Sequence, residues 1–243
     1  MIKKVIKQSI DGVLSRLGYK LERDQRGCPL IYLHTYSSYE EYASTQIFHN
    51  VRKLDQVWAD DKTLQIVAER VEKNMPDHSS SIEGICHGSR NGYEVKTLKN
   101  LFRLAGNASS AERQISVNII GTDISQTATQ FDDMIQWDFH DANPKFLDKF
   151  DFVYTNSLDQ SWKPFQALDT WLEQIKDTGL LIIEHTKSHG VEGASEMDPF
   201  GVQPEYMPYV LAEHYGHRIS LEIIKTKKSN NHLDCWLFVI KKS

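Results

Sequence analysis

Short apolar runs alternate with amphipathic segments from about residue 80 onward, and this alternation limits the fold more than any other feature. The run over 180–185 is almost continuously apolar, as expected for a strand buried on both faces of a sheet. Strands that alternate with helices form a mostly parallel sheet with helices on both faces. We therefore predict an α/β fold with a first strand that leads into a turn within 81–94 and later strands over 117–123, 134–139, 150–156 and 180–185, closed by an antiparallel C-terminal hairpin over 219–224 and 235–240.

A glycine-rich turn follows the first predicted strand, within Ser81–Glu94. An amphipathic helix begins at once, with Val95, Leu98 and Phe102 on one face. Glycine lets a ligand approach the backbone, and a helix N-terminus offers unpaired N–H groups to an anion. Such turns are common, so this one indicates a ligand site only together with the ends of the later strands.

Polar residues end the later strands in a consistent order: Asp123, then Asp138, then Asn156 with Ser157. In a parallel sheet, ligands bind at the carboxyl ends of the strands. A carboxylate at Asp123 can accept hydrogen bonds from both ribose hydroxyls. Asp138 can accept from an adenine amino group while the Phe139 N–H donates to the ring. Each acid alone also has a structural explanation, because Asp123 could cap the following helix.

In this order the motifs resemble those of class I S-adenosylmethionine-dependent methyltransferases, over roughly residues 80–243. The resemblance rests on EGICHGSR from Glu83, GTDIS from Gly121, QWDF from Gln136, FDFVYTNS from Phe150 and DTGL from Asp177. It implies a seven-stranded, mostly parallel, Rossmann-like sheet and S-adenosylmethionine as cofactor. The cofactor-binding residues that it implies are Glu83, Gly84, Cys86, His87, Gly88, Asp123, Ile124, Asp138, Phe139, Asn156 and Ser157.

The first turn departs from the family pattern acid-x-Gly-x-Gly-x-Gly. Aligned on Gly88, the outer glycines become Cys86 and Arg90, and Glu83 stands one residue before the acid position. His87 lies inside the turn. Cys86 is expected to fill a tight turn and not to act as a nucleophile, because only His87 could activate it. A cavity of altered shape and a loss of catalysis both remain open.

Candidate groups for the chemistry lie after the fourth and fifth strands, at Asp159, His185 and His189. Methyl transfer to a hydroxyl needs positioning and removal of a proton, and histidine suits the second task because its ordinary pKa is near ~6.5. A divalent metal held by carboxylate and imidazole is an alternative that we do not predict.

We predict O-methylation of a small-molecule or saccharide acceptor. A noncatalytic interaction protein of this fold, an RNA methyltransferase and a nicotinamide-dependent dehydrogenase remain as alternatives.

The 243 residues carry a net charge of −5 without a basic block, which disfavours a nucleic-acid partner. The three cysteines are far apart and form no CxxC pair, which is typical of a cytoplasmic protein. No apolar run approaches the ~20 residues of a membrane span. We predict a mainly helical N-terminal extension over 1–76 and a methyltransferase domain over 77–243. The extension begins with an amphipathic helix over 2–17, which we expect to pack on its own domain with a solvated lysine face; a membrane surface or a partner is the alternative. A homodimer stays open. The saccharide prediction rests on a loose resemblance of Leu14–Leu21 to bacterial surface-polysaccharide enzymes.

Overall fold

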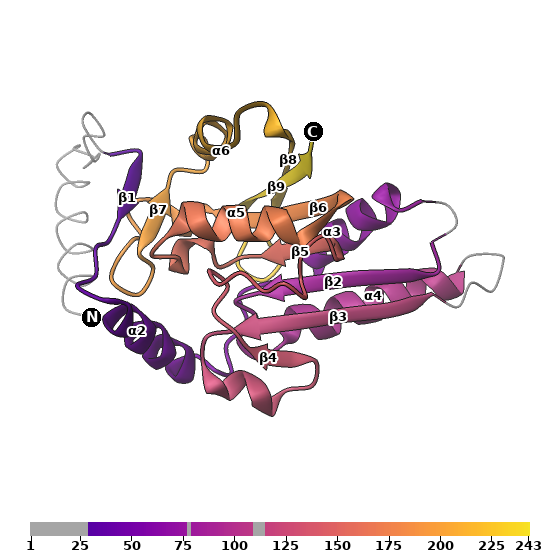
Figure 1. Cartoon of the computed structure of the whole chain (residues 1–243), viewed down its shortest axis with the longest axis horizontal. Coiled ribbons are helices and arrows are strands. Elements are labelled where there is room, and N and C mark those ends of the chain that lie inside the picture. Colours follow the sequence, from indigo (N-terminus) through magenta and orange to yellow (C-terminus); the bar gives the residue numbers. More distant parts are fainter. Residues whose placement is uncertain (1–28, 77–78, 109–114) are drawn as a thin grey trace, which may run out of the picture.

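The computed structural model describes residues 29–76, 79–108 and 115–243. Its centre is a seven-stranded sheet in the order β4-β3-β2-β5-β6-β9-β8 (Figure 1). Neighbouring strands from β4 to β6 are parallel, whereas β9 runs antiparallel to both β6 and β8. The predicted fold, including the closing hairpin, is confirmed. The strands are β2 (Ser81–His87), β3 (Ser116–Asp123), β4 (Met134–Gln136), β5 (Phe150–Thr155), β6 (Ile175–Thr186), β8 (Ile219–Lys227) and β9 (Asp234–Lys242).

Two hydrophobic cores lie on opposite faces of the sheet, and β6 contributes to both. Leu180 and Ile182 belong to the core with α3 (Asp61–Asn74) and α4 (Tyr93–Ala108). Leu181 and Ile183 belong to the core with α5 (Pro164–Gln174) and α6 (Met207–Tyr215). The alternation of side chains along a strand explains why this run is apolar at every position. Because α3 shares a core with α4 and the strands, this helix of the predicted extension packs on the sheet.

Residues 29–60, the described chain before α3, lie across the carboxyl edge of the sheet. A short strand β1 (Ile31–Leu33) pairs antiparallel with β7 (Phe200–Val202), and α2 (Tyr39–Arg52) follows it. Figure 1 shows α2 beside the ends toward which β2 and β3 point. Ser38 starts α2 by accepting a hydrogen bond from the Glu41 N–H. The sequence predicts a helix over 38–58, but α2 ends at Arg52 and an irregular arm over 53–60 leads to α3.

Several predicted boundaries differ from the observed ones. The interval after β3 is a short 3-10 helix, Gln126–Gln130, and β4 ends at Gln136. The sequence predicts a loop where β7 lies, because three residues are too few to show a strand period. The predicted helix over 2–17 and most of the predicted loop over 107–112 lie outside the described residues. Within the described residues, no helix has both the length and the apolar character needed to cross a membrane.

Candidate functional site

The turn after β2 brings three strand ends together. Gly88 has a φ of +69°, and a β-carbon there would lie 2.5 Å from the Ser157 side chain, so only glycine fits. Two residues later, the Arg90 N–H donates to Asp123 Oδ2 at 3.1 Å. The Ser157 hydroxyl in turn donates to the Gly88 carbonyl at 3.3 Å. The turn is therefore fixed to the residues that follow β5 and end β3.

Two adjoining cavities open at this carboxyl edge. The β3–β4 cavity is lined by Asp123, Ile124, Asp138 and Phe139, with α2 on its other side. The β5–β6 cavity has a volume of about 210 Å³ and is lined by residues after β5 and β6 and by the arm over 53–60. Both cavities share His49, Gly88, Arg90 and Gln160. The β3–β4 cavity has a volume of only about 20 Å³, so an elongated ligand that spanned both cavities past the glycine turn would need this cavity to widen.

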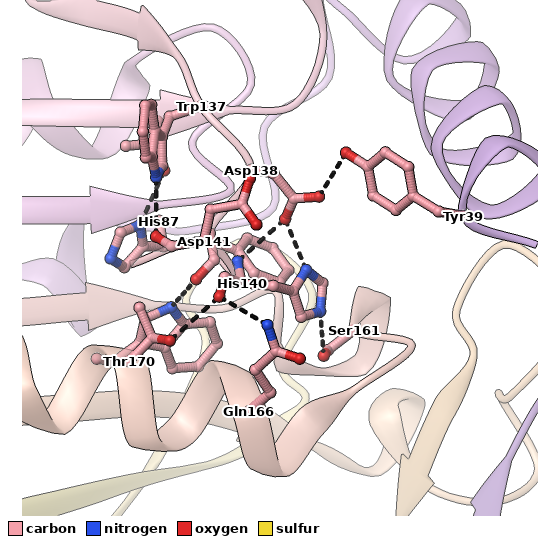
Figure 2. Close-up of polar contacts among 12 residues, drawn as sticks. Tyr39, His87, Trp137, Asp138, His140, Asp141, Ser161, Gln166 and Thr170 are labelled. Carbon is pink, nitrogen blue, oxygen red and sulfur yellow. Dashed lines mark hydrogen bonds and ion pairs between the residues drawn. The ribbon is translucent and has the colours of Figure 1, made fainter. Parts of the chain in front are cut away.

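Both acids of the β3–β4 cavity are hydrogen-bonded to backbone close in sequence. Asp123 Oδ1 accepts from the Ser125 N–H at 2.9 Å, and burial raises the pKa of this carboxyl to about 6. Asp138 Oδ1 accepts from the His140 N–H at 3.0 Å and lies 2.6 Å from His140 Nδ1 (Figure 2). Burial raises the pKa of Asp138, but the hydrogen bonds and charge of His140 outweigh it, so that the pKa is lowered.

Helix α2 covers the β3–β4 cavity. The Tyr39 hydroxyl donates to Asp138 Oδ2 at 3.0 Å (Figure 2). Tyr42 stacks on Trp162 with ring centroids 5.3 Å apart. Gln46 lines the cavity and donates to the Met197 carbonyl at 3.1 Å. The sequence suggests α2 as a cap with Tyr39 and Gln46 near the methionine end of the cofactor. In the structure, Tyr39 lies at the Asp138 end and Gln46 lies against the 188–198 loop.

The β5–β6 cavity differs, because several polar atoms around it have no partner. Among the described residues, nine buried side-chain nitrogen or oxygen atoms lack a hydrogen bond, and five belong to residues that line this cavity. Buried polar groups are otherwise almost always satisfied, so such a cluster marks a place for a polar ligand or water. The five atoms are His49 Nδ1, Trp58 Nε1, Arg90 Nε, Glu94 Oε2 and Asp159 Oδ1.

Burial raises the pKa values of the acids around this cavity and lowers those of the histidines. Burial raises the pKa of Glu94 and of Asp159 to about 7, although Arg90 lowers both. Burial and the charge of Lys228 lower the pKa of His189 to about 3. His189 Nε2 lies 3.9 Å from Asp159 Oδ2. At neutral pH the imidazole is therefore uncharged, but its low pKa makes it a weaker proton acceptor than Asp159, whose pKa lies near neutrality.

Most predicted site residues reach the two cavities. His185 does not: its Nε2 lies 2.8 Å from the Val202 carbonyl oxygen, and its ring lies beside that of His189, with centroids 5.2 Å apart. It is thus behind His189 with respect to the cavity. The predicted residues that line one of the cavities are Gly88, Asp123, Ile124, Asp138, Phe139, Asn156, Ser157, Asp159 and His189.

Four predicted cofactor residues lie within β2, and none of them lines either cavity. Glu83 accepts a hydrogen bond from Asn118 at 2.7 Å, and Gly84 packs against the Phe152 ring. Cys86 is buried in the core with α3 and α4, and burial raises its thiol pKa. His87 bridges Thr122 and Gln174 at 2.8 and 2.7 Å. Because none of these four residues lines a cavity, the cavities give no support to their predicted role as cofactor contacts.

Other cavity residues were not identified from the sequence. Arg90 stands where the family has a glycine, and its guanidinium donates to the Lys53 and Gln56 carbonyls at 3.4 and 3.2 Å. That substitution was the only available signal. Glu94 is in the first turn of α4, and its Oε1 accepts from Asn156 at 3.1 Å. His49, Lys53, Trp58 and Asp198 come from segments whose sequence carries no motif.

Metal ligation finds no support in the described parts of the chain. Within them, no three His, Cys, Asp or Glu side chains are grouped so that they could hold a metal ion.

No family model and no curated protein matches the sequence, whereas solved structures do match the fold. The chain is similar to the Burkholderia thailandensis 1,6-didemethyltoxoflavin-N1-methyltransferase, with a TM-score of 0.60 and 9% identity over 86% of this chain and 92% of that one. It is similar to the plantazolicin methyltransferase, with a TM-score of 0.59 and 8% identity over 84% of this chain and 98% of that one. It is also similar to the [4+2]-cyclase SpnF, with a TM-score of 0.50 and 12% identity over 73% of this chain and 80% of that one. The chain therefore has the class I methyltransferase fold.

Proposed function

We propose that the protein is an S-adenosylmethionine-dependent methyltransferase. The observation that carries this proposal is the pair of cavities that meet at Gly88, at the carboxyl ends of the parallel strands. Asp123 would hold the ribose, and Asp138 with the Phe139 N–H would hold the adenine. The two structures of this fold named as methyltransferases above were solved with S-adenosylhomocysteine, in one case beside 1,6-didemethyltoxoflavin and in the other beside a plantazolicin analogue.

The β5–β6 cavity suits the methionine end of the cofactor. Arg90 and Lys53 supply positive charge for a carboxylate, and the unpartnered Glu94 Oε2 can accept from an ammonium group. When bound, S-adenosylmethionine supplies a methyl group activated by a sulfonium centre. The protein's own contribution is then to position the acceptor and to take up its proton.

We further propose an oxygen acceptor on a small molecule or saccharide. Asp159 and His189 are the groups that can take a hydroxyl proton, since both face the β5–β6 cavity and the imidazole is uncharged at neutral pH. The volume of about 210 Å³ suits the methionine end of the cofactor and a small reacting group. The saccharide class rests only on the 14–21 stretch, which lies outside the described residues. A cytoplasmic location is proposed from the scattered cysteines.

Calorimetry with S-adenosylmethionine and S-adenosylhomocysteine tests the cofactor proposal directly. We expect micromolar binding of both, and no binding at millimolar ligand would refute it. A screen of sugar, nucleotide-sugar and small phenolic acceptors with labelled methyl donor then tests the acceptor class. Transfer to nitrogen or carbon only would refute the oxygen proposal and leave methyl transfer intact.

Histidine variants separate the catalytic from the structural interpretation. We expect His189→Ala to lower turnover by about 100-fold or more, the usual contribution of a general base, with unchanged S-adenosylhomocysteine affinity. His185→Ala should have a smaller effect, because His185 acts on His189 from behind. Equal losses of turnover and cofactor affinity in His189→Ala would make that histidine structural.

A noncatalytic protein of this fold is the second candidate. It is favoured by the first turn, where Cys86 lies in the core and Arg90 occupies a glycine position with a φ of 45°. Binding of S-adenosylhomocysteine without turnover on any acceptor in the screen would support it. The RNA methyltransferase alternative has less support, since the net charge is −5.

A further inference from the structure

A fully buried lysine lies behind the β5–β6 cavity. Lys228 is the first residue after β8, in the turn that leads to β9, and its side chain is 0% exposed. Its Nζ donates to Glu184 Oε1 of β6 at 2.6 Å. Glu184 Oε2 in turn accepts from the Tyr154 hydroxyl of β5 at 2.7 Å. The ammonium is thus withdrawn from water into a network that spans two central strands.

Stability alone does not account for this ion pair. A buried pair gains little over well-packed apolar residues, because removing two charges from water offsets their attraction. A lysine in a hairpin turn would ordinarily extend into solvent, as Lys227 does next to it with a 67% exposed side chain. The inward orientation of Lys228 therefore needs a further explanation, which the other contacts of its ammonium provide.

The ammonium also faces an aromatic residue of the arm over 53–60. Lys228 Nζ lies 4.6 Å from the centroid of the Trp58 ring, within the range of a cation–π contact. The Trp58 ring lies 5.2 Å from the His189 ring, at an interplanar angle of 38°. Both Trp58 and His189 line the β5–β6 cavity. A chain of contacts thus leads from the hairpin turn to the imidazole.

The same turn contacts the arm at a second point. The Ser229 N–H donates to Asp60 Oδ2 at 3.1 Å. Asp60 is also the N-cap of α3, because its Oδ1 accepts from the Thr63 N–H at 2.9 Å. The turn therefore holds the arm just before α3, two residues from Trp58.

We propose that Lys228 is a positioning residue of the transfer site: its ammonium holds Trp58 against His189 and so fixes the imidazole beside Asp159. The inference rests on the proposed function, since it takes His189 as the proton acceptor. It adds a residue that touches neither cavity and belongs to the C-terminal hairpin.

The charge of Lys228 also bears on the protonation of His189. Asp159 lies on one side of this imidazole, with Oδ2 3.9 Å from Nε2, and its own raised pKa keeps it protonated in the range where His189 titrates. His185 stands behind the imidazole, and Asp198 lines the same cavity close enough to Asp159 to interact with it. Burial and the charge of Lys228 lower the His189 pKa.

The test is nuclear magnetic resonance of the His189 ring in the double variant Lys228→Met/Glu184→Gln, with His189→Gln used for assignment. Methionine fills the space of the lysine stem, and the introduced glutamine can still accept from the Tyr154 hydroxyl. We expect the ring-current shift of His189 Hε1 to shrink and its titration midpoint to rise, by less than the ~1 pH unit of a single nearby charge because the Glu184 charge is removed as well. Lys228→Arg should keep both near wild type. Lys225→Met is the matched control, since Lys225 lies over Trp236 at 5.9 Å on an exposed part of β8.

Trp58→Leu removes the aromatic partner of the Lys228–Trp58 contact and keeps the Lys228–Glu184 pair. It should move the His189 resonance in the same direction, whether or not the double variant folds. An unchanged His189 resonance in Trp58→Leu, or in a folded double variant, would overturn the inference. Calorimetry with S-adenosylhomocysteine on the wild type is independent of this result. Absent binding refutes the proposed function alone, whereas retained binding with an unmoved His189 refutes the role of Lys228 alone.

Discussion

The β3–β4 and β5–β6 cavities adjoin at Gly88 but differ in how far the hydrogen bonds of their acids are satisfied. In the first, the carboxylates of Asp123 and Asp138 accept hydrogen bonds from backbone two residues away. In the second, Glu94 and Asp159 each leave one buried oxygen without a partner. The acids of the first cavity are therefore already hydrogen-bonded in the free protein, whereas those of the second keep an oxygen available for what binds there.

This difference separates recognition from reactivity. Carboxylates held by neighbouring N–H groups keep a fixed position, which suits repeated binding of one cofactor. Unpartnered groups with perturbed pKa values are costly to bury and are typical of sites where protons move. The β3–β4 cavity can thus define the cofactor, while the β5–β6 cavity carries the chemistry that distinguishes this protein.

The largest expected effect comes from the residue on which both cavities depend. Gly88→Ala should lower the free energy of unfolding by about 2–4 kcal/mol, because a β-carbon at this left-handed position strains the backbone and meets Ser157. It should also lower S-adenosylhomocysteine affinity by about 100-fold, measured by calorimetry. Gly216→Ala is the matched control, since Gly216 also has a positive φ of +58° but nothing within 4 Å. Equal effects of both changes would show that the turn has no special relation to the ligand.

The second prediction breaks the β3–β4 cavity alone. Asp123→Ala should weaken S-adenosylhomocysteine binding by about 1–3 kcal/mol, the contribution of hydrogen bonds to a buried charged group. Asp169→Ala removes an acid on α5 that pairs with His214 at 2.9 Å, and it should leave affinity unchanged. If calorimetry gives wild-type affinity for Asp123→Ala, the ribose role is wrong.

The same contrast explains how far the sequence could predict the molecule. The strands, the closing hairpin and the β3–β4 cavity depend on local patterns: apolar runs, strand-end acids and a glycine turn. The β5–β6 cavity depends on residues distant in sequence, such as Trp58 and Asp198, which no spacing relates. The error over β2 has a related cause, because the motif identified the turn but not which of its residues belong to the strand. Cys86 and His87 alternate toward the two cores, and neither lines a cavity.

The third prediction uses the perturbed acid of the β5–β6 cavity. Burial raises the pKa of Asp159 to about 7 from an ordinary value of 3.8, so the folded protein retains a proton that the unfolded chain loses. Stability is thus lost as pH rises toward 7, and the penalty is fully developed above it. Asp159→Asn should raise the free energy of unfolding by about 1–3 kcal/mol at pH 8 and by less at pH 5, while turnover falls.

Chemical denaturation at both pH values measures this effect. Asp148→Asn gives the background, since Asp148 has a 70% exposed side chain and pairs with Lys242 far from the cavity. A gain that is the same at pH 5 and pH 8 would show that the carboxyl of Asp159 is not strained by burial.

The smallest effect tests whether the β3–β4 cavity is complete without its α2 cover. Tyr39 is 43% exposed, and its hydroxyl is one of several donors to Asp138. Tyr39→Phe should therefore lower the free energy of unfolding by at most about 0.5–1.5 kcal/mol, the contribution of one hydrogen bond. The affinity for S-adenosylhomocysteine should change by less than about threefold, because His140 still holds the carboxylate in place. Tyr209→Phe, at an exposed tyrosine of α6, is the control. A tenfold loss of affinity in Tyr39→Phe would mean that α2 belongs to the cofactor site itself, and the contrast between a complete and an incomplete cavity would then fail.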